Sequence, residues 1–217
     1  MPVELTEAGI AATIEDYASA AANAIEAGFD GVELHGANGY LIHQFLSTNA
    51  NQRTDKWGGS RHNRVRFAIE TAKAVADRIG SHRVGLRVSP GVTNNDIHEA
   101  DPHETYAELV DGLKPIGLAY LHVFEGVPRH HLVAAQGVQR HVHPQPVHAR
   151  RFTSKENFDL IEDGTTDILT FGALFLANPD LPGALPKTSP STPQTPRPST
   201  AATTTATPTT QPSEKTS

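Results

Sequence analysis

Apolar residues recur along the first part of the chain with two spacings, and the two spacings alternate. Apolar residues three and four apart predict helices, whereas strict alternation of apolar and polar residues predicts strands. A helix is expected from about Ile14 to Ile25, with Gly28 as the glycine that follows its end. The next run, Val32 to Leu34, alternates as a half-buried strand does.

The same succession continues downstream. Ser60 can cap a helix that Gly80 closes, and Asp101 opens a second helix with the residue order of a capping box. Strands are expected over residues 84–88 and 118–124, where apolar residues alternate with polar ones or cluster. Strands that alternate with helices in this way predict an α/β fold with a parallel sheet.

The pattern weakens over residues 127–151, which are rich in histidine and proline, and only a weak strand is expected over residues 138–142. A capping box at residues 153–156 and a strand at 167–171 restore it. The breaks near residues 138 and 183 resemble a shifted reading frame. Residues 187–217, rich in Pro, Ser and Thr, are expected to form a disordered tail, which leaves residues 1–186 as one domain.

Composition narrows the class of protein. The chain has 217 residues, a net charge of −6 and no cysteine, which argues against nucleic acid as a partner and excludes disulfides and thiolate sites. It lacks a signal peptide and any apolar run of about 18 residues, so a membrane partner is not expected. We therefore expect a cytoplasmic protein. His141 and His143 have no carboxylate nearby, so a solvated loop is favoured over a metal site.

The residues best suited to catalysis directly follow the first expected strand. His35, Asn38 and Tyr40 stand within six residues of a glycine-rich turn, and their side chains can all donate hydrogen bonds. Enzymes of the α/β class place ligands at the carboxyl ends of strands. Two donors that converge on a carbonyl oxygen polarise it, and a nearby phenol can supply a proton. The alternative is a polar turn in which His35 and Asn38 only satisfy backbone groups.

Longer motifs around this turn resemble the old yellow enzyme family of flavin-dependent ene reductases. The resemblance rests on GFDGVELHGANGYLIHQFL at 28–46 and NQRTDKWGGS at 51–60, and it resumes with VGLRVSP at 84–90, AYLH at 119–122, DILTFG at 167–172 and ANPDL at 177–181. It covers roughly residues 1–125 and 153–182. It implies a TIM (β/α)8 barrel that is incomplete here, with about strands 4 to 8 of the eight that a closed barrel requires.

The resemblance also implies a reaction. NADH or NADPH passes hydride to FMN, and the reduced flavin passes it to the β-carbon of a small-molecule activated alkene. His35 and Asn38 would hold the substrate oxygen, and Tyr40 would protonate the α-carbon. Arg87 would lie beside the flavin, and backbone N–H groups of Gly172 and Ala173 would face its phosphate, although the family usually has arginine where Ala173 stands.

Two further alternatives remain open. Arg87 alternates with Leu86 and Val88, so it is either a surface arginine or, in a barrel covered by helices, a residue of the lumen. The chain as a whole is either an enzyme or a catalytically inactive barrel fragment that does not hold flavin. In both cases an incomplete barrel leaves a strand edge and apolar faces to be covered, so we expect a homo-oligomer.

Overall fold

Five parallel strands form one sheet in a computed structural model that describes residues 3–124, 140–143, 166–170 and 173–184. Each strand pairs with the next along the chain, and every pair is parallel. An order that never reverses differs from that of doubly wound sheets and is the order of a barrel wall. The parallel α/β fold predicted from the sequence is thus confirmed. The strands are β1 (Val32–Gly36), β2 (Val84–Val88), β3 (Tyr120–Phe124), β4 (Arg140–His143) and β5 (Ile168–Leu169).

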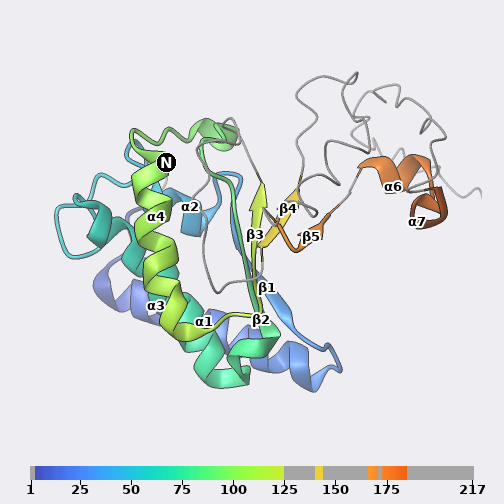
Figure 1. Ribbon diagram of the computed structural model, residues 1–217. Coiled ribbons are helices and arrows are strands. Elements are labelled where there is room, and N and C mark those ends of the chain that lie inside the picture. The colour runs from blue at the N-terminus through green and yellow to red at the C-terminus, as the bar shows by residue number, and fades with distance from the viewer. Residues whose placement is uncertain (1–2, 125–139, 144–165, 171–172, 185–217) are drawn as a thin grey trace, which may run out of the picture.

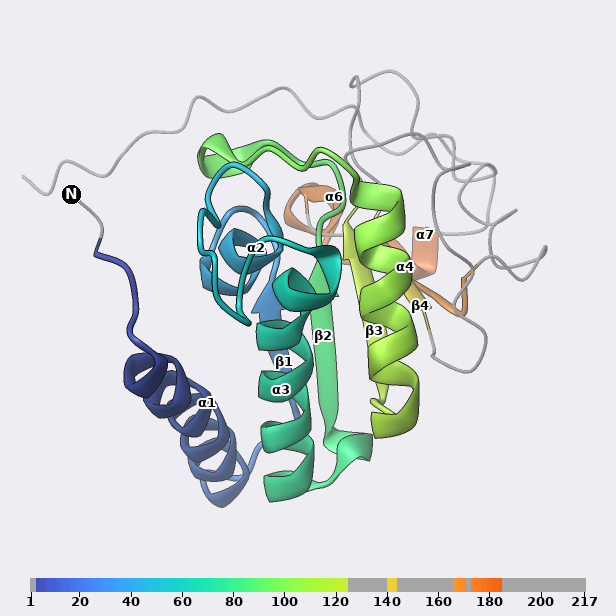
Figure 2. The same ribbon diagram turned by 90° about the vertical axis from the view of Figure 1, so that its left-hand side faces the viewer.

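The longer helices lie together on one face of this sheet (Figures 1 and 2). In Figure 2, α3 and α4 stand in front of β1, β2 and β3, and α1 lies beside α3. α3 also packs against α2, so it is the centre of the helical layer. The helices are α1 (Glu7–Glu26), α2 (Leu41–Leu46), α3 (Arg61–Ile79), α4 (Pro102–Leu113), α6 (Ala173–Ala177) and α7 (Leu181–Ala184).

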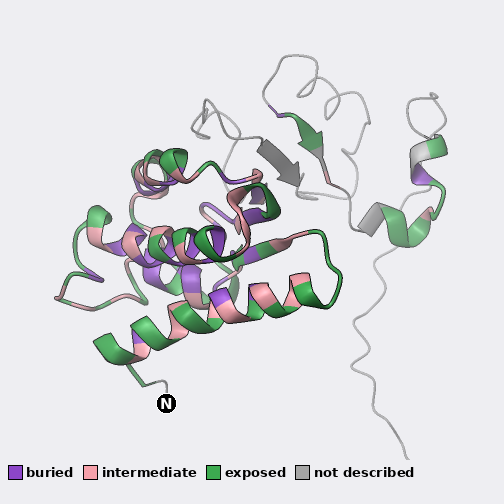
Figure 3. Ribbon diagram, turned by 90° about the horizontal axis from the view of Figure 1, so that it is seen from below, coloured by how far each residue is buried: buried purple, intermediate pink, exposed green. Residues whose placement is uncertain are grey.

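The strands have one apolar and one polar face. Pairing in register places Leu34, Leu86 and Leu121 at one level, and all three are buried on the face that the helices cover. Helix α1 shows the matching pattern, with a buried and half-buried stripe on one side and exposed residues on the other (Figure 3). Burial of this apolar layer is the main favourable term for the fold.

Polar caps define two of the three long helices. The Thr6 hydroxyl accepts a hydrogen bond from the Gly9 N–H at the start of α1, and Ser60 accepts one from the Asn63 N–H at the start of α3. α3 ends at Gly80, whose φ of 90° suits glycine. These contacts satisfy backbone groups that a helix end otherwise leaves without a partner. The Ser60 cap and the Gly80 terminus are as predicted.

The predicted capping box of α4 is wrong in its chemistry. Asp101 is the N-cap residue and Pro102 is at the first turn, but the Asp101 side chain caps no backbone N–H. Its carboxylate instead accepts from the Arg64 guanidinium at 2.8 Å and from the Thr105 hydroxyl at 3.2 Å. A charged donor competes successfully with the backbone because a charge-assisted hydrogen bond is the stronger one.

The strand boundaries differ from those expected in three places. β3 begins at Tyr120 instead of Leu118, and β5 is limited to two residues. β4 spans Arg140–His143, so the expectation of a solvated loop around His141 and His143 is wrong, because the backbone pairs with β3. The helix expected behind residues 153–156, the end of the last expected strand and the tail at 187–217 lie outside the described residues. Within the described part, no helix is long and apolar enough to cross a membrane.

Arg64 ties the helical layer to the loops above it. Its guanidinium donates to the backbone oxygens of Leu46 and Gly59, at 3.0 and 2.7 Å, as well as to Asp101 and Thr105. Its side chain is 7% exposed. The arginine thus joins the end of α2, the following loop and the start of α4 through groups that have little access to water.

Replacing Arg64 with methionine should lower the free energy of unfolding by about 3–5 kcal/mol, because it leaves buried acceptors without their charged partner. Arg66→Met is the matched control. Arg66 donates to the Lys56 oxygen in an exposed setting, so its loss should cost less than about 1 kcal/mol. Urea denaturation of both variants measures the difference. Equal small losses would show that the Arg64 contacts do not hold the layer together.

Candidate functional site

The turn after β1 has a backbone that few residues tolerate. Asn38 and Gly39 both have positive φ, at 56° and 81°. Asparagine visits this left-handed region more readily than most side chains do. At Gly39 a Cβ atom would lie 2.4 Å from the Asn94 backbone oxygen, so only glycine fits. The Asn-Gly pair therefore builds a tight turn that carries His35 on one side and Tyr40 on the other.

The structure brings the three predicted donors to one end of the sheet. The rings of His35 and Tyr40 have centroids 5.1 Å apart, and Tyr40 remains 56% exposed. Asn38 lies between them in sequence, and its Oδ1 is buried without a hydrogen-bond partner among the described residues. His35 and Tyr40 thus face open space, and the Asn38 side chain is not occupied by a local backbone group.

Arg87 lies beside this cluster on the polar face of the sheet. Strand pairing places it level with His35 on β1 and His122 on β3. Its guanidinium lies over the Phe124 ring, 5.3 Å from the ring centroid, while its Nε is buried without a hydrogen-bond partner in the part of the chain that is described. Arg87 lies on the face turned away from the helices and is partly buried.

A second polar group, which sequence reasoning missed, extends from this level to the layer below it on the same face. The His122 ring joins two partners, with Nδ1 3.0 Å from a Glu33 oxygen and Nε2 3.3 Å from the Thr170 hydroxyl. Tyr120, level with Gly85 and Glu33, also hydrogen-bonds Glu33. The available signal was the polar residues two apart in β1 and β3, because such residues point to the same face.

These contacts change the protonation of the layer. Burial disfavours the Glu33 carboxylate, but the hydrogen bond and charge of His122, with a hydrogen bond from Tyr120 and the charge of Arg87, together lower the pKa of Glu33 overall. Burial raises the pKa of Tyr120 to about 12, and the neighbouring Glu33 charge adds to the effect. Glu33 is thus held as an anion and Tyr120 as a neutral phenol, which leaves a fixed negative charge beneath His35 and Arg87.

His35 is held in its neutral form. Partial burial lowers the pKa of His35, and the Arg87 charge lowers it further, while the Glu33 charge opposes both. A neutral imidazole has one N–H donor and one acceptor nitrogen. At neutral pH the site thus offers a carbonyl-type ligand a neutral imidazole donor, a carboxamide and a phenol beside a permanent guanidinium cation.

A comparison with known proteins decides the family. The model of the NADH:flavin oxidoreductase / NADH oxidase family matches residues 1–191. The chain belongs to this family. The resemblance to old yellow enzymes inferred from the motifs is confirmed, and so are the cofactor classes of the family, FMN and a nicotinamide.

Individual relatives agree with this assignment. The chain is 43% identical over 180 residues to 12-oxophytodienoate reductase 1 of Oryza sativa subsp. japonica, covering 78% of this chain and 46% of that protein. It is 40% identical over 189 residues to 12-oxophytodienoate reductase 2 of Arabidopsis thaliana, covering 83% and 50%. The chain thus spans about half the length of the curated relatives it matches.

Solved structures match over a similar extent. Morphinone reductase in complex with tetrahydroNAD is 36% identical with a TM-score of 0.76, and the match covers 84% of this chain and 50% of that one. The old yellow enzyme from Trypanosoma cruzi is 32% identical, with the same TM-score and coverage. These neighbours are TIM-barrel enzymes.

Of the two residues expected at a phosphate, Ala173 begins α6 and Gly172 lies outside the described residues.

Arg87→Met should raise the pKa of His35 towards its ordinary value, because the change removes a cation that disfavours the imidazolium. Arg87→Lys keeps a positive charge and should leave the pKa of His35 lowered. An NMR titration of the imidazole protons measures both. If the methionine variant left the titration midpoint of His35 where it was, the arrangement of Arg87 and His35 described above would be wrong.

Proposed function

We propose that this chain is the substrate-binding part of an FMN-dependent oxidoreductase that reduces activated alkenes with NADH or NADPH. The observation that carries the proposal is the placement of three donors, His35, Asn38 and Tyr40, beside Arg87 at the carboxyl end of parallel strands. Ligands of α/β folds bind at that end. We further propose that the five strands form part of a TIM-barrel wall, with the polar face as its lumen.

His35 and Asn38 would bind the electron-withdrawing oxygen of the substrate. The Asn38 Oδ1 has no hydrogen-bond partner among the described residues, so the carboxamide is not tied to a local group and can turn to direct Nδ2, a donor, to the substrate. Two neutral donors stabilise negative charge that develops on the oxygen as the double bond is reduced, and the loss of one such donor typically costs about 2.7–4 kcal/mol of barrier. Tyr40, exposed next to His35, would then deliver a proton to the α-carbon.

Arg87 fits a position beside the flavin. It is a partly buried cation whose Nε lacks a hydrogen-bond partner in the described residues, and an electron-rich ring edge would supply an acceptor and negative charge. FMN, when bound, supplies the hydride transfer between the nicotinamide and the alkene. The Phe124 ring under the guanidinium adds a cation–π contact that stabilises its charge.

Phosphate binding would rely on backbone groups. The proposal places the N–H groups of Gly172 and Ala173 at the FMN phosphate, as the motif at 167–172 suggests. Alanine at position 173 removes a guanidinium contact that the family usually has. A charge-assisted hydrogen bond of this kind is worth about 1.5–3 kcal/mol, which corresponds to a roughly ten- to hundredfold weaker affinity for FMN.

The alternative function is a catalytically inactive barrel fragment that does not hold flavin. The observation that favours this alternative is the alanine at position 173, where the family usually has an arginine that contacts the phosphate. Both functions predict the same fold and the same exposed donors. They differ in whether the chain binds FMN.

A titration of the purified chain with FMN, followed by quenching of flavin fluorescence, separates the two. The proposal predicts saturable binding that Arg87→Met weakens about ten- to hundredfold, because a charged hydrogen-bond donor is lost. Arg83→Met is the matched control, since Arg83 is exposed at the opposite end of β2 and should leave affinity unchanged. Equal affinity in all three proteins would contradict the role of Arg87, and no binding at all would favour the inactive fragment.

Tyr40→Phe should slow reoxidation by an activated alkene and leave reduction by the nicotinamide intact. The phenol is required only after hydride has reached the substrate, and the ring contact with His35 survives the change. Loss of a positioned proton donor typically costs about 10²–10⁴-fold in rate. Stopped-flow spectroscopy follows the two half-reactions separately, and an equal loss in both would exclude Tyr40 as the proton donor.

A further inference from the structure

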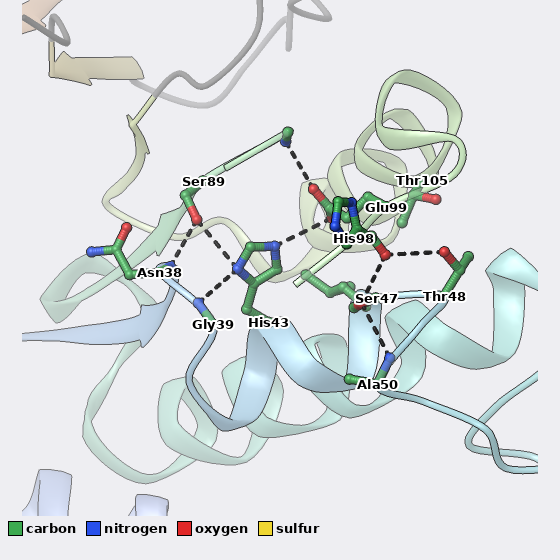
Figure 4. A network of polar contacts seen from close by, with 12 residues as sticks. Asn38, Gly39, His43, Ser47, Thr48, Ala50, Ser89, His98, Glu99 and Thr105 are labelled. Carbon is green, nitrogen blue, oxygen red and sulfur yellow. Dashed lines mark hydrogen bonds and ion pairs between the residues drawn. The ribbon is translucent and has the colours of Figure 1, made fainter. Parts of the chain in front are cut away.

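Another histidine, His43, is fully buried behind the turn that carries the donors. It lies in α2, and its ring points to the backbone of the turn instead of to the open face (Figure 4). Its Nδ1 accepts a hydrogen bond from the Gly39 N–H at 2.9 Å. Burial of a polar ring costs free energy unless hydrogen bonds within the protein replace those it made to water. The contacts of the His43 ring are ones that an apolar side chain of similar size could not make.

The contact with Gly39 determines which nitrogen carries the proton. A backbone N–H can only donate, so Nδ1 must present its lone pair, and the proton of the neutral ring is on Nε2. Nε2 lies 3.4 Å from a carboxylate oxygen of Glu99, whose side chain is 3% exposed. The second Glu99 oxygen accepts from the Gly91 N–H at 2.8 Å. The hydrogen bond from Gly39 and the nearby Glu99 carboxylate thus favour one orientation of the His43 ring.

Two other side chains hold the same turn. Ser89, at the end of β2, accepts a hydrogen bond from the Asn38 N–H at 2.8 Å. Asn95 donates to the Asn38 backbone oxygen, also at 2.8 Å. As Figure 4 shows, the backbone N–H groups of Asn38 and Gly39 point towards Ser89 and His43, whereas the Asn38 side chain points away from them. A non-glycine residue with positive φ persists only where its surroundings fix it in this way.

We propose that His43 is a positioning residue for the reaction described above, and this inference rests on that proposed function. It does not touch the substrate. It fixes the Gly39 N–H, and with Ser89 it holds the left-handed turn in which the Asn38 side chain faces the substrate oxygen and Tyr40 lies next to His35. A donor displaced by a fraction of an ångström loses much of its effect on a developing charge, so the rigidity of the turn matters to the chemistry.

Two substitutions separate this role from simple filling of space. His43→Leu keeps an apolar side chain of similar size but leaves the Gly39 N–H without an acceptor. His43→Asn places Oδ1 near the position of Nδ1, so it retains the acceptor for Gly39 although it cannot reach Glu99. If His43 only fills space, leucine should be the better replacement. If His43 positions the turn, asparagine should be the better replacement.

Amide hydrogen exchange at the turn, measured by NMR on the chain without flavin, is the first test. His43→Leu should speed exchange of the Gly39 amide about tenfold or more while the Asn38 amide, which Ser89 holds, changes less. His43→Asn should keep the Gly39 amide protected. Ser89→Ala should instead speed exchange of the Asn38 amide more than that of the Gly39 amide. Equal Gly39 exchange in the wild-type protein and the leucine variant would overturn the proposal.

Binding of a phenol, whose oxygen resembles that of the substrate, to the FMN-loaded protein is the second test. The leucine variant should bind the phenol about tenfold more weakly, with unchanged affinity for FMN, and the asparagine variant should restore phenol binding. Leucine-variant affinity equal to that of the wild type, despite faster Gly39 exchange, would overturn the positioning role. A wild-type protein that binds neither FMN nor phenol would contradict the proposed function instead, and the exchange experiment would still report on the turn.

Discussion

In-register parallel pairing is the constraint on which the site depends. It places every second residue of neighbouring strands on one face and at one level, so His35, Arg87 and His122 form a row across β1, β2 and β3. Helices cover the opposite face, where Leu34, Leu86 and Leu121 form the equivalent row. A shift of one residue in any strand would turn the side chains of that strand to the opposite face. The apolar core and the polar site are therefore fixed by the same register.

The polar face is organised in layers with different charges. The deeper layer holds an anion, since His122 stabilises the Glu33 carboxylate. The upper layer holds the Arg87 cation and a neutral His35. Opposite charges in adjacent layers allow a permanent cation on a partly buried strand, because each charge offsets part of the desolvation cost of the other. Donors on the turn are then held by a separate set of contacts, from α2 and the loop after β2.

The periodic parts of the structure could be predicted from the sequence, and the contacts between distant segments could not. Apolar spacing identified α1, α3 and the strands β1 and β2, because each pattern is local. The role of Asp101 was missed because its partner, Arg64, lies 37 residues away and outcompetes the local backbone. Glu33 and His122 are 89 residues apart, and only the strand register shows that they meet. The donor cluster was found because its three residues are neighbours in the chain.

A crystal structure of the chain with FMN and a phenol bound would show whether these residues form an active site. We expect the phenol oxygen to lie within about 2.7–3.1 Å of donor atoms on both His35 and Asn38, with Tyr40 over the ring and the Arg87 guanidinium at the edge of the flavin. The contrary result would be a phenol bound elsewhere, with His35 and Asn38 turned to backbone partners of their own. The turn would then be a polar connection between β1 and α2, and the interpretation of these residues as an active site would be wrong.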